Sequence, residues 1–477
     1  MVDLISPLLT DLYQLTMAYG YWKLGLHERP AVFHQIFRKN PFKGNYALAC
    51  GLASVIEFLK DYRFSSTDLA YLASLHLPKG DTLFSTDFLQ YLADLRFTCD
   101  VDAIPEATLI FPHEPLIRIT GPLLQGQLVE STILNILNFQ TLIATKASRV
   151  CQAANGDTVL EFGMRRAQGP DGALSASRAA YIGGCTATSN VLAGKCYDIP
   201  VRGTHAHSWV TVFPDEMTAF LAYIDVIPHN CVLLVDTFDT IQGVKNAIQA
   251  GLALRQKGGE LIGIRLDSGD LAVLSRQARE LLDAAGFQHT RIIASNSLDE
   301  YVIAALKQKG AKIDTWGVGT HLVSSYDYPA LDGVYKLSAL QNANGAWEYK
   351  LKLSDTAIKI SNPGIYQIRR YLKQGVPVQD MLYDVEKKIA SPLNIYSFDA
   401  PHVMLPLKNH TDCQDLLVPV FRQGQCVYPT ESIHTIRQRG IDQIRTFQAN
   451  FPHGKPYPVG LERNFHETKQ QLIQMHK

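Results

Sequence analysis

The chain has 477 residues, of which 46% are hydrophobic and 19% are charged, a composition that is ordinary for a globular protein with a large buried core. Lys and Arg together number 45, as do Asp and Glu, so the formal net charge is zero. This balance argues against nucleic acid or an anionic membrane as the main partner. No apolar run approaches the ~20 residues of a membrane span, and the length predicts two or three domains.

The cysteines and the start of the chain indicate the cellular compartment. No two of the eight cysteines have the close CxxC spacing of a zinc or thioredoxin-type site. We therefore expect reduced, mostly buried thiols, which fits the cytoplasm. Residues 1–7 lack a basic segment followed by an apolar stretch, so we expect no signal peptide.

The first segment, residues 1–145, is predicted to contain helices over residues 10–23 and 131–148. Thr10 can cap the first helix, and the apolar spacing leaves Tyr13 off the buried stripe. That stripe is predicted to consist of Leu12, Leu15, Tyr19 and Trp22. Tyr13 is therefore not expected in the core of this segment.

The middle segment, residues 146–350, has a different rhythm, because short apolar runs alternate with helical stretches about every 30 residues. Strands are predicted at residues 232–236, 261–265, 291–296 and 313–320, and helices at 240–257, after 270, and at 298–309. This pattern predicts βα units in a parallel sheet.

Polar residues follow each of these four runs. They are Asp236, Arg265 with Asp267, Asn296, and Gly319 with Thr320. Because the carboxyl ends of parallel strands form the site face of such folds, four consecutive units of this kind predict one shared pocket.

The last segment, residues 351–477, mixes basic turns, short strands and a predicted helix near residues 431–450. It carries no obvious chemical motif. We interpret it as a structural domain.

The glycine-rich run from Gly317 to Thr320 is a candidate phosphate loop. Gly317 and Gly319 allow the backbone to approach a phosphate, and the Thr320 hydroxyl can donate to it. Alone, this run is better explained by a tight turn. As the last of four polar strand ends it favours phosphate binding.

The run from Arg265 to Asp270 is a candidate anion clamp. Arg265 and Asp267 point to the same side of an extended strand, so they can form a structural ion pair or hold a ligand anion beside a carboxylate. That carboxylate can accept ribose hydroxyls or bind Mg²⁺. Asp236 is either a ligand for metal or ribose, or the N-cap of the helix that follows it.

Two further runs carry aromatic, basic and histidine side chains. Phe162 can stack on a flat heteroaromatic ring and Arg165 can hold an anion, although these residues alone are better explained by a core Phe beside surface arginines. His205 and His207 would face one side of an extended segment, but no third metal ligand is evident. One of these histidines can instead act as a nucleophile toward a phosphoryl group.

Seven motifs taken together resemble the nicotinate phosphoribosyltransferase family over nearly the whole chain. They lie at residues 9–14, 37–42, 161–169, 203–207, 265–270, 317–320 and 457–459. The resemblance implies an α/β fold, namely an irregular TIM-like α/β barrel of type II phosphoribosyltransferases. It also implies an N-terminal α/β domain (1–145), the barrel as catalytic domain (146–350) and a small C-terminal domain (351–477).

The resemblance implies an activity as well. Nicotinate and 5-phosphoribosyl 1-pyrophosphate would give nicotinate mononucleotide and pyrophosphate, in the first step of NAD salvage from nicotinate. ATP would be a co-substrate in a ligase-type reaction, with Mg²⁺ or Mn²⁺ as the cofactor. The family is usually dimeric, with its sites at the interface, so a homodimer is expected.

The resemblance assigns roles to several residues position by position, and the strand-end positions described above suggest the roles of the others. His207 matches the histidine that ATP transiently phosphorylates, and His205 departs from the family, which usually has a smaller or apolar residue there. The expected nicotinate contacts are Tyr13, Phe162, Arg165, Thr204 and Arg265. The expected contacts to the phosphoribosyl donor are Asp236, Asn296, Gly317, Gly319 and Thr320. Asp267 is the second expected catalytic residue, and Asp267 and Asp270 are the expected metal ligands.

Three alternatives remain open at this point. The same chemistry on nicotinamide or quinolinate would use similar residues. A barrel aldolase or isomerase would typically need a placed Lys or a pair of acids, which the strand ends do not offer. A catalytically inactive nucleotide-binding scaffold is the third.

Overall fold

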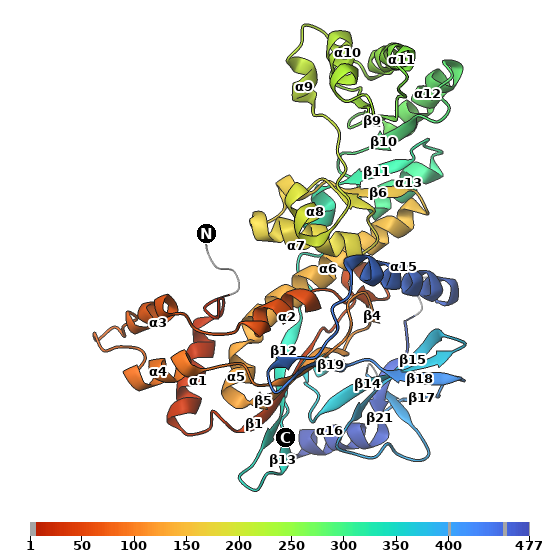
Figure 1. Cartoon of the computed structure of the whole chain (residues 1–477). Coiled ribbons are helices and arrows are strands. Elements are labelled where there is room, and N and C mark those ends of the chain that lie inside the picture. Colours follow the sequence, from red (N-terminus) through yellow and green to blue (C-terminus); the bar gives the residue numbers. More distant parts are fainter. Residues whose placement is uncertain (1–5, 399–401, 452–455, 477) are drawn as a thin grey trace. The chain divides into compact units, whose positions relative to one another are not determined.

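A computed structural model describes residues 6–398, 402–451 and 456–476 (Figure 1). The first five residues, on which the expectation of no signal peptide partly rests, lie outside the described residues. The chain forms two compact units. The barrel unit comprises Ile143–Pro329 and Ile433–Ile441, and the terminal unit comprises Met1–Leu142, Ala330–Ser432 and Asp442–Lys477.

The barrel unit is built on a six-stranded sheet in the order β7-β6-β11-β10-β9-β8. The strands are β6 (Thr158–Glu161), β7 (Ala187–Thr188), β8 (Val232–Leu234), β9 (Gly263–Leu266), β10 (Arg291–Ala294) and β11 (Thr315–Val318). Every pairing in it is parallel. Among the described residues no pairing joins the two end strands, so the barrel is irregular and open, and the predicted fold class is confirmed.

Helices follow the strands as the sequence predicts. They are α7 (Gly169–Ile182), α8 (Val191–Tyr197), α9 (His207–Thr211), α10 (Glu216–Val226), α11 (Thr240–Gln256), α12 (Leu271–Ala284), α13 (Glu300–Gln308) and α14 (Thr320–Val323). Aspartates cap three of them, because Asp239, Asp270 and Asp299 accept backbone N–H groups of the first turns of α11, α12 and α13. Two longer helices, α6 (Glu130–Ala154) and α15 (Ile433–Asn450), contribute residues to both units.

The terminal unit contains two larger sheets and one two-stranded sheet. Their orders are β13-β12-β1-β5-β3-β19-β20, β17-β16-β21-β15-β14-β18 and β2-β4. The early strands are β1 (Pro30–Ile36), β2 (Ala47–Leu48), β3 (Asp100–Ala103), β4 (Leu109–Ile110) and β5 (Pro115–Pro122). The later strands are β12 (Val334–Gln341), β13 (Trp347–Tyr349), β14 (Tyr366–Lys373), β15 (Val376–Asp384), β16 (Ile395–Ser397), β17 (Met404–Leu405), β18 (Asp412–Asp415), β19 (Val418–Arg422), β20 (Gln425–Cys426) and β21 (Val459–Glu462).

The first of these sheets joins distant parts of the chain. Strand β1 pairs antiparallel with β12, and β3 pairs antiparallel with β19. The first and last segments, which the sequence analysis treats as separate domains, therefore share one compact unit. The helices of this unit are α1 (Leu12–Lys23), α2 (Leu52–Lys60), α3 (Ser66–Ala73), α4 (Thr86–Asp94), α5 (Leu123–Leu128) and α16 (Arg463–Met475).

Helix α1 differs in detail from its prediction. It begins at Leu12 with Asp11 as N-cap, so Thr10 is not the cap. Its buried residues are Gln14, Leu15 and Ala18. Leu12 was predicted in the buried stripe and is instead about half exposed, as is its neighbour Tyr13.

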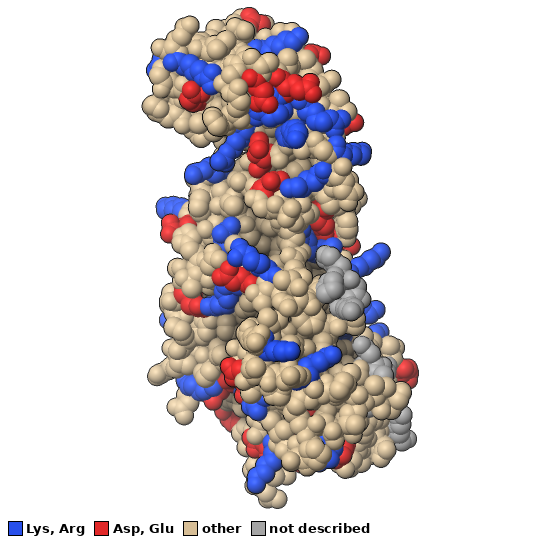
Figure 2. Space-filling view, turned by 90° about the vertical axis from the view of Figure 1, so that its right-hand side faces the viewer, with Lys and Arg blue, Asp and Glu red and all other residues tan. Residues whose placement is uncertain are grey.

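The surface agrees with the composition, whereas only four of the eight cysteines are buried, so the expectation of mostly buried thiols is wrong. Figure 2 shows basic and acidic side chains interspersed over the visible face, without a large field of one sign. All eight cysteines are free thiols. In the part of the chain that the structure describes, no helix combines the length and the apolar character that crossing a membrane requires.

Candidate active site

A polar pocket of about 380 Å³ lies in the barrel unit, at the carboxyl ends of the strands. It is lined by Phe162, Arg165, Arg166, Ser189, Gly203, Thr204, Arg265, Asp267, Ser295, Asn296, Ser297, Gly317, Gly319 and Thr320. The sheet register explains why residues from separate strands meet in this pocket, because Ala294 pairs with both Leu266 and Trp316. The polar residues that follow β9 and β10 are therefore level with one another.

Arg265 is the centre of the hydrogen-bond network in this pocket. Its Nε donates to Ser295 Oγ at 2.8 Å, its Nη1 to Thr204 Oγ1 at 3.1 Å, and its Nη2 to Asp267 Oδ1 at 3.0 Å. The guanidinium also lies 5.8 Å from the centre of the Phe162 ring. Because a guanidinium has five N–H donors, these bonds fix its orientation and leave two donors for a ligand.

Asp267 is held as firmly as Arg265. Its Oδ1 accepts from Arg265 and in a short bond from Ser295 Oγ, and its backbone N–H donates to Asp236 Oδ2 at 2.9 Å. Its Oδ2 lies 3.8 Å from His207 Nε2. One carboxylate therefore connects the arginine with the histidine.

The two histidines of the 203–207 motif have different environments. His205 is 9% exposed, its Nε2 accepts the backbone N–H of Leu234 at 3.1 Å, and burial lowers the pKa of its imidazole. The side chain of His207 is 43% exposed, and its Nδ1 lies 3.1 Å from Thr237 Oγ1. His205 therefore has a structural role, and His207 is the accessible imidazole.

The remaining carboxylates divide between structural and ligand-binding positions. Asp239, not Asp236, caps α11, so the N-cap alternative for Asp236 is wrong. Asp236 Oδ2 accepts from Asp267 N and Ser268 Oγ, whereas its buried Oδ1 has no hydrogen-bond partner among the described residues. Asp270 caps α12 through its Oδ1.

A metal ion therefore fits Asp236 and Asp267 better than Asp270. No cluster of three or more His, Cys, Asp or Glu side chains that could hold a metal occurs within residues 6–398, 402–451 and 456–476. Mg²⁺ that is bound together with substrate phosphates needs only one or two carboxylates. The unpartnered Asp236 Oδ1 is a donor of the correct type.

The two glycines of the predicted phosphate loop are explained in part by Phe162. A Cβ on Gly317 would lie 2.7 Å from the Phe162 ring, and a Cβ on Gly319 would lie 3.1 Å from the Phe162 backbone oxygen. Gly317 is thus required for the ring to pack against β11. Thr320 begins the short helix α14 and is exposed to the pocket.

The loop after β10 has an unusual backbone. Asn296 and Ser297 have φ angles of 81° and 48°, which lie in the left-handed region that non-glycine residues rarely adopt. Both residues line the pocket. Consecutive strained residues of this kind concentrate at ligand-binding sites.

Most expected barrel residues are brought together, and several pocket residues were missed. Arg165 lies in the turn Met164–Arg166 and lines the pocket beside Arg166, which was not predicted. Ser189 and Ser295 were also missed, although both directly follow the strands β7 and β10. Tyr13 belongs to the terminal unit, so its expected contact stays a prediction.

This arrangement defines a class of protein. It is an open parallel α/β barrel with a polar, arginine-lined pocket at its strand ends and an accessible histidine beside a paired arginine and aspartate. Comparison with known proteins identifies the family. Three family models match: the nicotinate phosphoribosyltransferase (NAPRTase) N-terminal domain over residues 8–138, the nicotinate phosphoribosyltransferase (NAPRTase) family over 158–361, and the nicotinate phosphoribosyltransferase C-terminal domain over 366–469.

Relatives agree with these matches. Nicotinate phosphoribosyltransferase of Bacillus subtilis is 40% identical over 97% of this chain and 94% of its own length. The human enzyme of the same name is 34% identical over 90% of this chain and 88% of its own. The chain therefore belongs to the nicotinate phosphoribosyltransferase family.

Solved structures show the same fold. The crystal structure of human nicotinic acid phosphoribosyltransferase has a TM-score of 0.84 and 31% identity, covering 97% of this chain and 99% of that one. Nicotinate-nucleotide pyrophosphorylase from Pyrococcus furiosus has a TM-score of 0.71 at 21% identity, covering 94% of this chain and 98% of that one, which shows a shared fold.

Proposed function

We propose that this chain transfers the phosphoribosyl group of 5-phosphoribosyl 1-pyrophosphate to nicotinate, with coupled ATP hydrolysis through a phosphohistidine at His207. The products are nicotinate mononucleotide and pyrophosphate, so the reaction belongs to NAD biosynthesis. The observation that supports this most directly is the position of His207, 3.8 Å from the carboxylate that Arg265 also binds. A nucleophile toward phosphate and an anion clamp thus share one pocket.

The chemistry of nicotinate determines what the pocket must do. The pyridine nitrogen has a free lone pair, so no base is needed to activate it. The difficult step is the departure of pyrophosphate from ribose C1, which leaves positive character on that carbon. The site must therefore position the ring and neutralise the leaving group.

Each pocket residue has a task in this scheme. Phe162 stacks on the pyridine ring, with Arg165 at its edge, and the two free N–H groups of Arg265 hold the nicotinate carboxylate next to Thr204. Gly319 and Thr320 hold the 5′-phosphate, with Asn296 on the ribose. Asp267 accepts the ribose hydroxyls or binds the metal.

A divalent metal, Mg²⁺ or Mn²⁺, would be held by Asp236 and Asp267 together with substrate phosphates, and would neutralise charge on pyrophosphate. Asp236 Oδ1 is available for this role because it accepts no hydrogen bond from the described residues. Asp270 already caps α12 through its Oδ1, which makes this carboxylate less available than that of Asp236.

ATP coupling is assigned to His207. Transfer of the γ-phosphoryl group to an imidazole nitrogen releases ADP, and later hydrolysis of the N–P bond releases phosphate. The phosphohistidine adds about 1.5–2 negative charges and new acceptor oxygens, which can organise the metal and the donor. The ligase-type classification follows from this cycle.

A homodimer in the cytoplasm completes the proposal, with Tyr13 reaching the nicotinate site of the second subunit. The support is the exposed apolar surface of α1 around Tyr13, where Leu12 and Met17 are 54% and 38% exposed. Apolar side chains that remain exposed in this way are typical of protein interfaces.

The test is the stoichiometry of ADP release per nicotinate mononucleotide formed. We expect His207→Ala to abolish ATP coupling and to retain slow, ATP-independent transfer. His289→Ala is the matched control, since His289 is an exposed histidine of the same unit outside the pocket. Equal coupling in wild type and His207→Ala would refute the phosphohistidine.

Comparison of three pyridines tests the substrate. Product formation from nicotinate, nicotinamide and quinolinate should be fastest with nicotinate, because a charged hydrogen bond from Arg265 to a carboxylate is roughly twice as strong as one to an amide. A preference for nicotinamide or quinolinate would reassign the substrate. Absence of product from all three in a single-turnover assay would indicate an inactive scaffold.

A further inference from the structure

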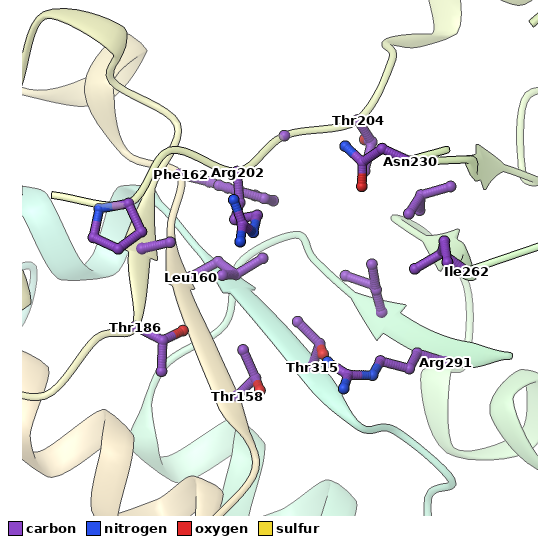
Figure 3. Close-up of a pocket in the computed structure, with 15 residues that line it drawn as sticks. Thr158, Leu160, Phe162, Thr186, Arg202, Thr204, Asn230, Ile262, Arg291 and Thr315 are labelled. Carbon is purple, nitrogen blue, oxygen red and sulfur yellow. The ribbon is translucent and has the colours of Figure 1, made fainter. Parts of the chain in front are cut away.

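A second cavity, of about 320 Å³, lies in the barrel unit nearer the amino ends of the strands (Figure 3). Its wall includes Thr158, Arg291 and Thr315, which are the first residues of β6, β10 and β11. Alternate residues of a strand face the same side, so Thr158, Leu160 and Phe162 all line this cavity. It occupies the space that packed side chains fill in a closed barrel.

The second cavity adjoins the polar pocket. Phe162, Gly203 and Thr204 line both. The Phe162 ring is in turn close to Gly317 and to the Arg265 guanidinium. A molecule in the second cavity would therefore touch the same ring that faces the proposed nicotinate position.

The lining has the chemistry of a site for a small aromatic acid. Buried apolar walls come from Leu160, Val232 and Ile293, and the polar groups include the guanidiniums of Arg202 and Arg291. Within the described part of the chain, the Arg291 guanidinium has no hydrogen-bond or ion-pair partner, and Figure 3 shows it reaching toward Thr315. An apolar cavity with a few placed polar groups is typical of small-ligand sites of about 300–1,000 Å³.

We propose that this cavity is an accessory site for a single-ring aromatic carboxylate, with the ring between Leu160 and Ile293 and the carboxylate on Arg291. It is separate from the position where nicotinate reacts. Through Phe162, its occupancy changes nicotinate affinity, and nicotinate changes the affinity of the accessory site by the same factor.

Benzoate tests this proposal, because it has the ring and the carboxylate but no ring nitrogen to react. Isothermal titration calorimetry on the full chain should find two benzoates per chain in wild type and one in Arg291→Gln. Arg265→Gln should retain the accessory site and lose the other. The affinity of the accessory site should fall about tenfold or more in Arg291→Gln, since a charge-assisted bond is lost.

Two controls keep the result interpretable. Lys245→Gln removes the same charge from an exposed position on α11 and should bind as wild type does. Leu160→Trp narrows the cavity from β6, a different strand from that of Arg291, and it should also remove one benzoate. Benzoate binding that is unchanged in both Arg291→Gln and Leu160→Trp, or that is lost entirely in Arg265→Gln, would overturn the accessory site.

These binding measurements involve no turnover. Failure of the proposed phosphoribosyl transfer would appear separately, as absence of nicotinate mononucleotide from wild type. Arg291→Gln, which lies outside the proposed catalytic machinery, should form that product at close to the wild-type rate.

Discussion

His205 and His207 are two positions apart, and their different environments come from local backbone geometry. An extended segment would direct both rings to one side. Helix α9 instead begins at His207, so the chain turns between the two residues. The ring of His205 packs beside that of Tyr223, with 4.7 Å between the ring centres, whereas the His207 side chain remains exposed and contacts Thr237. The sequence identified the motif, but it could not show where the helix starts.

The contact between Thr237 and His207 predicts a positioning role for this threonine. Thr237→Val keeps the shape of the side chain but removes the hydroxyl that faces His207 Nδ1. The imidazole then lacks the hydrogen bond that fixes its orientation. We expect the ADP-coupled rate to fall roughly fivefold to tenfold, which corresponds to about 1 kcal/mol for one hydrogen bond.

Thr237→Ser retains the hydroxyl and should recover most of that rate. Steady-state kinetics should place the loss in kcat for the ATP-coupled reaction rather than in the KM for nicotinate. If Thr237→Val and Thr237→Ser behave alike, the hydroxyl has no such role.

At the scale of the elements, the βα units of the barrel were predictable because their signals are local. Aspartates directly precede α11, α12 and α13, and each accepts backbone N–H groups of the first turn. The predicted helices over 240–257 and 298–309 therefore end close to the observed boundaries. Helix α1 was less accurate because its burial depends on partners elsewhere in the chain, such as Ser131, which donates to Asp11.

The packing of Phe162 on β11 predicts a specific effect of Gly317→Ala. The added methyl group would lie 2.7 Å from the ring and force Phe162 to move. Since Phe162 is also the proposed stacking partner of nicotinate, we expect the KM for nicotinate to rise about tenfold and the Tm to fall. Gly172→Ala on α7 is the matched control, because nothing lies within 4 Å of its added Cβ. An unaltered KM in Gly317→Ala would separate Phe162 from substrate binding.

The loop between β4 and β5 predicts a pH dependence of stability. Burial, and then the positive charges of Lys469 and Arg38, lower the pKa of His113 to about 4. In the unfolded chain a histidine pKa is about 6.5. As the pH falls from 6.5 toward 4, the unfolded chain binds a proton that the folded protein does not, so the free energy of unfolding decreases by up to about 3 kcal/mol.

His113→Asn removes this titration and suits the left-handed backbone at this position, where φ is 72°. It also removes the stacking on Phe398, a loss that does not depend on pH. In urea denaturation, the free energy of unfolding of wild type minus that of the variant should therefore decrease as the pH falls from 7 to 4.5. A difference that stays constant over this range would contradict the assignment.

At the scale of the whole molecule, the sequence did not predict which strands pair across long distances in the chain. Within the barrel sheet, the pairs β8–β9, β9–β10 and β10–β11 join strands that follow one another in the chain, and their periodic pattern shows this. The pairing of β6 with β11 already joins residues that are far apart, since Thr158 pairs with Thr315. The pairing of β1 with β12 joins residues about three hundred positions apart, and nothing local marks it. For this reason the terminal segments were interpreted as two domains, and their common unit became visible only in the structure.

A buried ionic cluster stabilises the terminal unit. Arg370 donates to both carboxylate oxygens of Asp380, and Tyr457 donates to Asp380 Oδ1 at 2.8 Å. Glu114 is fully buried beside them. Burial, and then the negative charge of Asp380, raise the pKa of Glu114 well above its usual range.

The two acids of this cluster should respond differently to amide substitution. Asp380→Asn leaves the Arg370 charge buried without its partner and should cost about 3–5 kcal/mol. Glu114→Gln keeps the size of a carboxyl group whose pKa burial raises, so it removes less charge interaction and should cost under about 1 kcal/mol. Thermal unfolding of both variants measures the contrast. Equal losses would mean that Glu114 is ionised in the folded protein.

The pairing of β3 with β19 means that the terminal unit can be completed only late in translation. Until residue 422 has emerged from the ribosome, β3 is an edge strand with open N–H and C=O groups. By then every strand of the barrel sheet has already been translated. A polypeptide that stops before residue 418 would contain these six strands, but the edge of β3 would remain unpaired. Such a polypeptide would tend to aggregate.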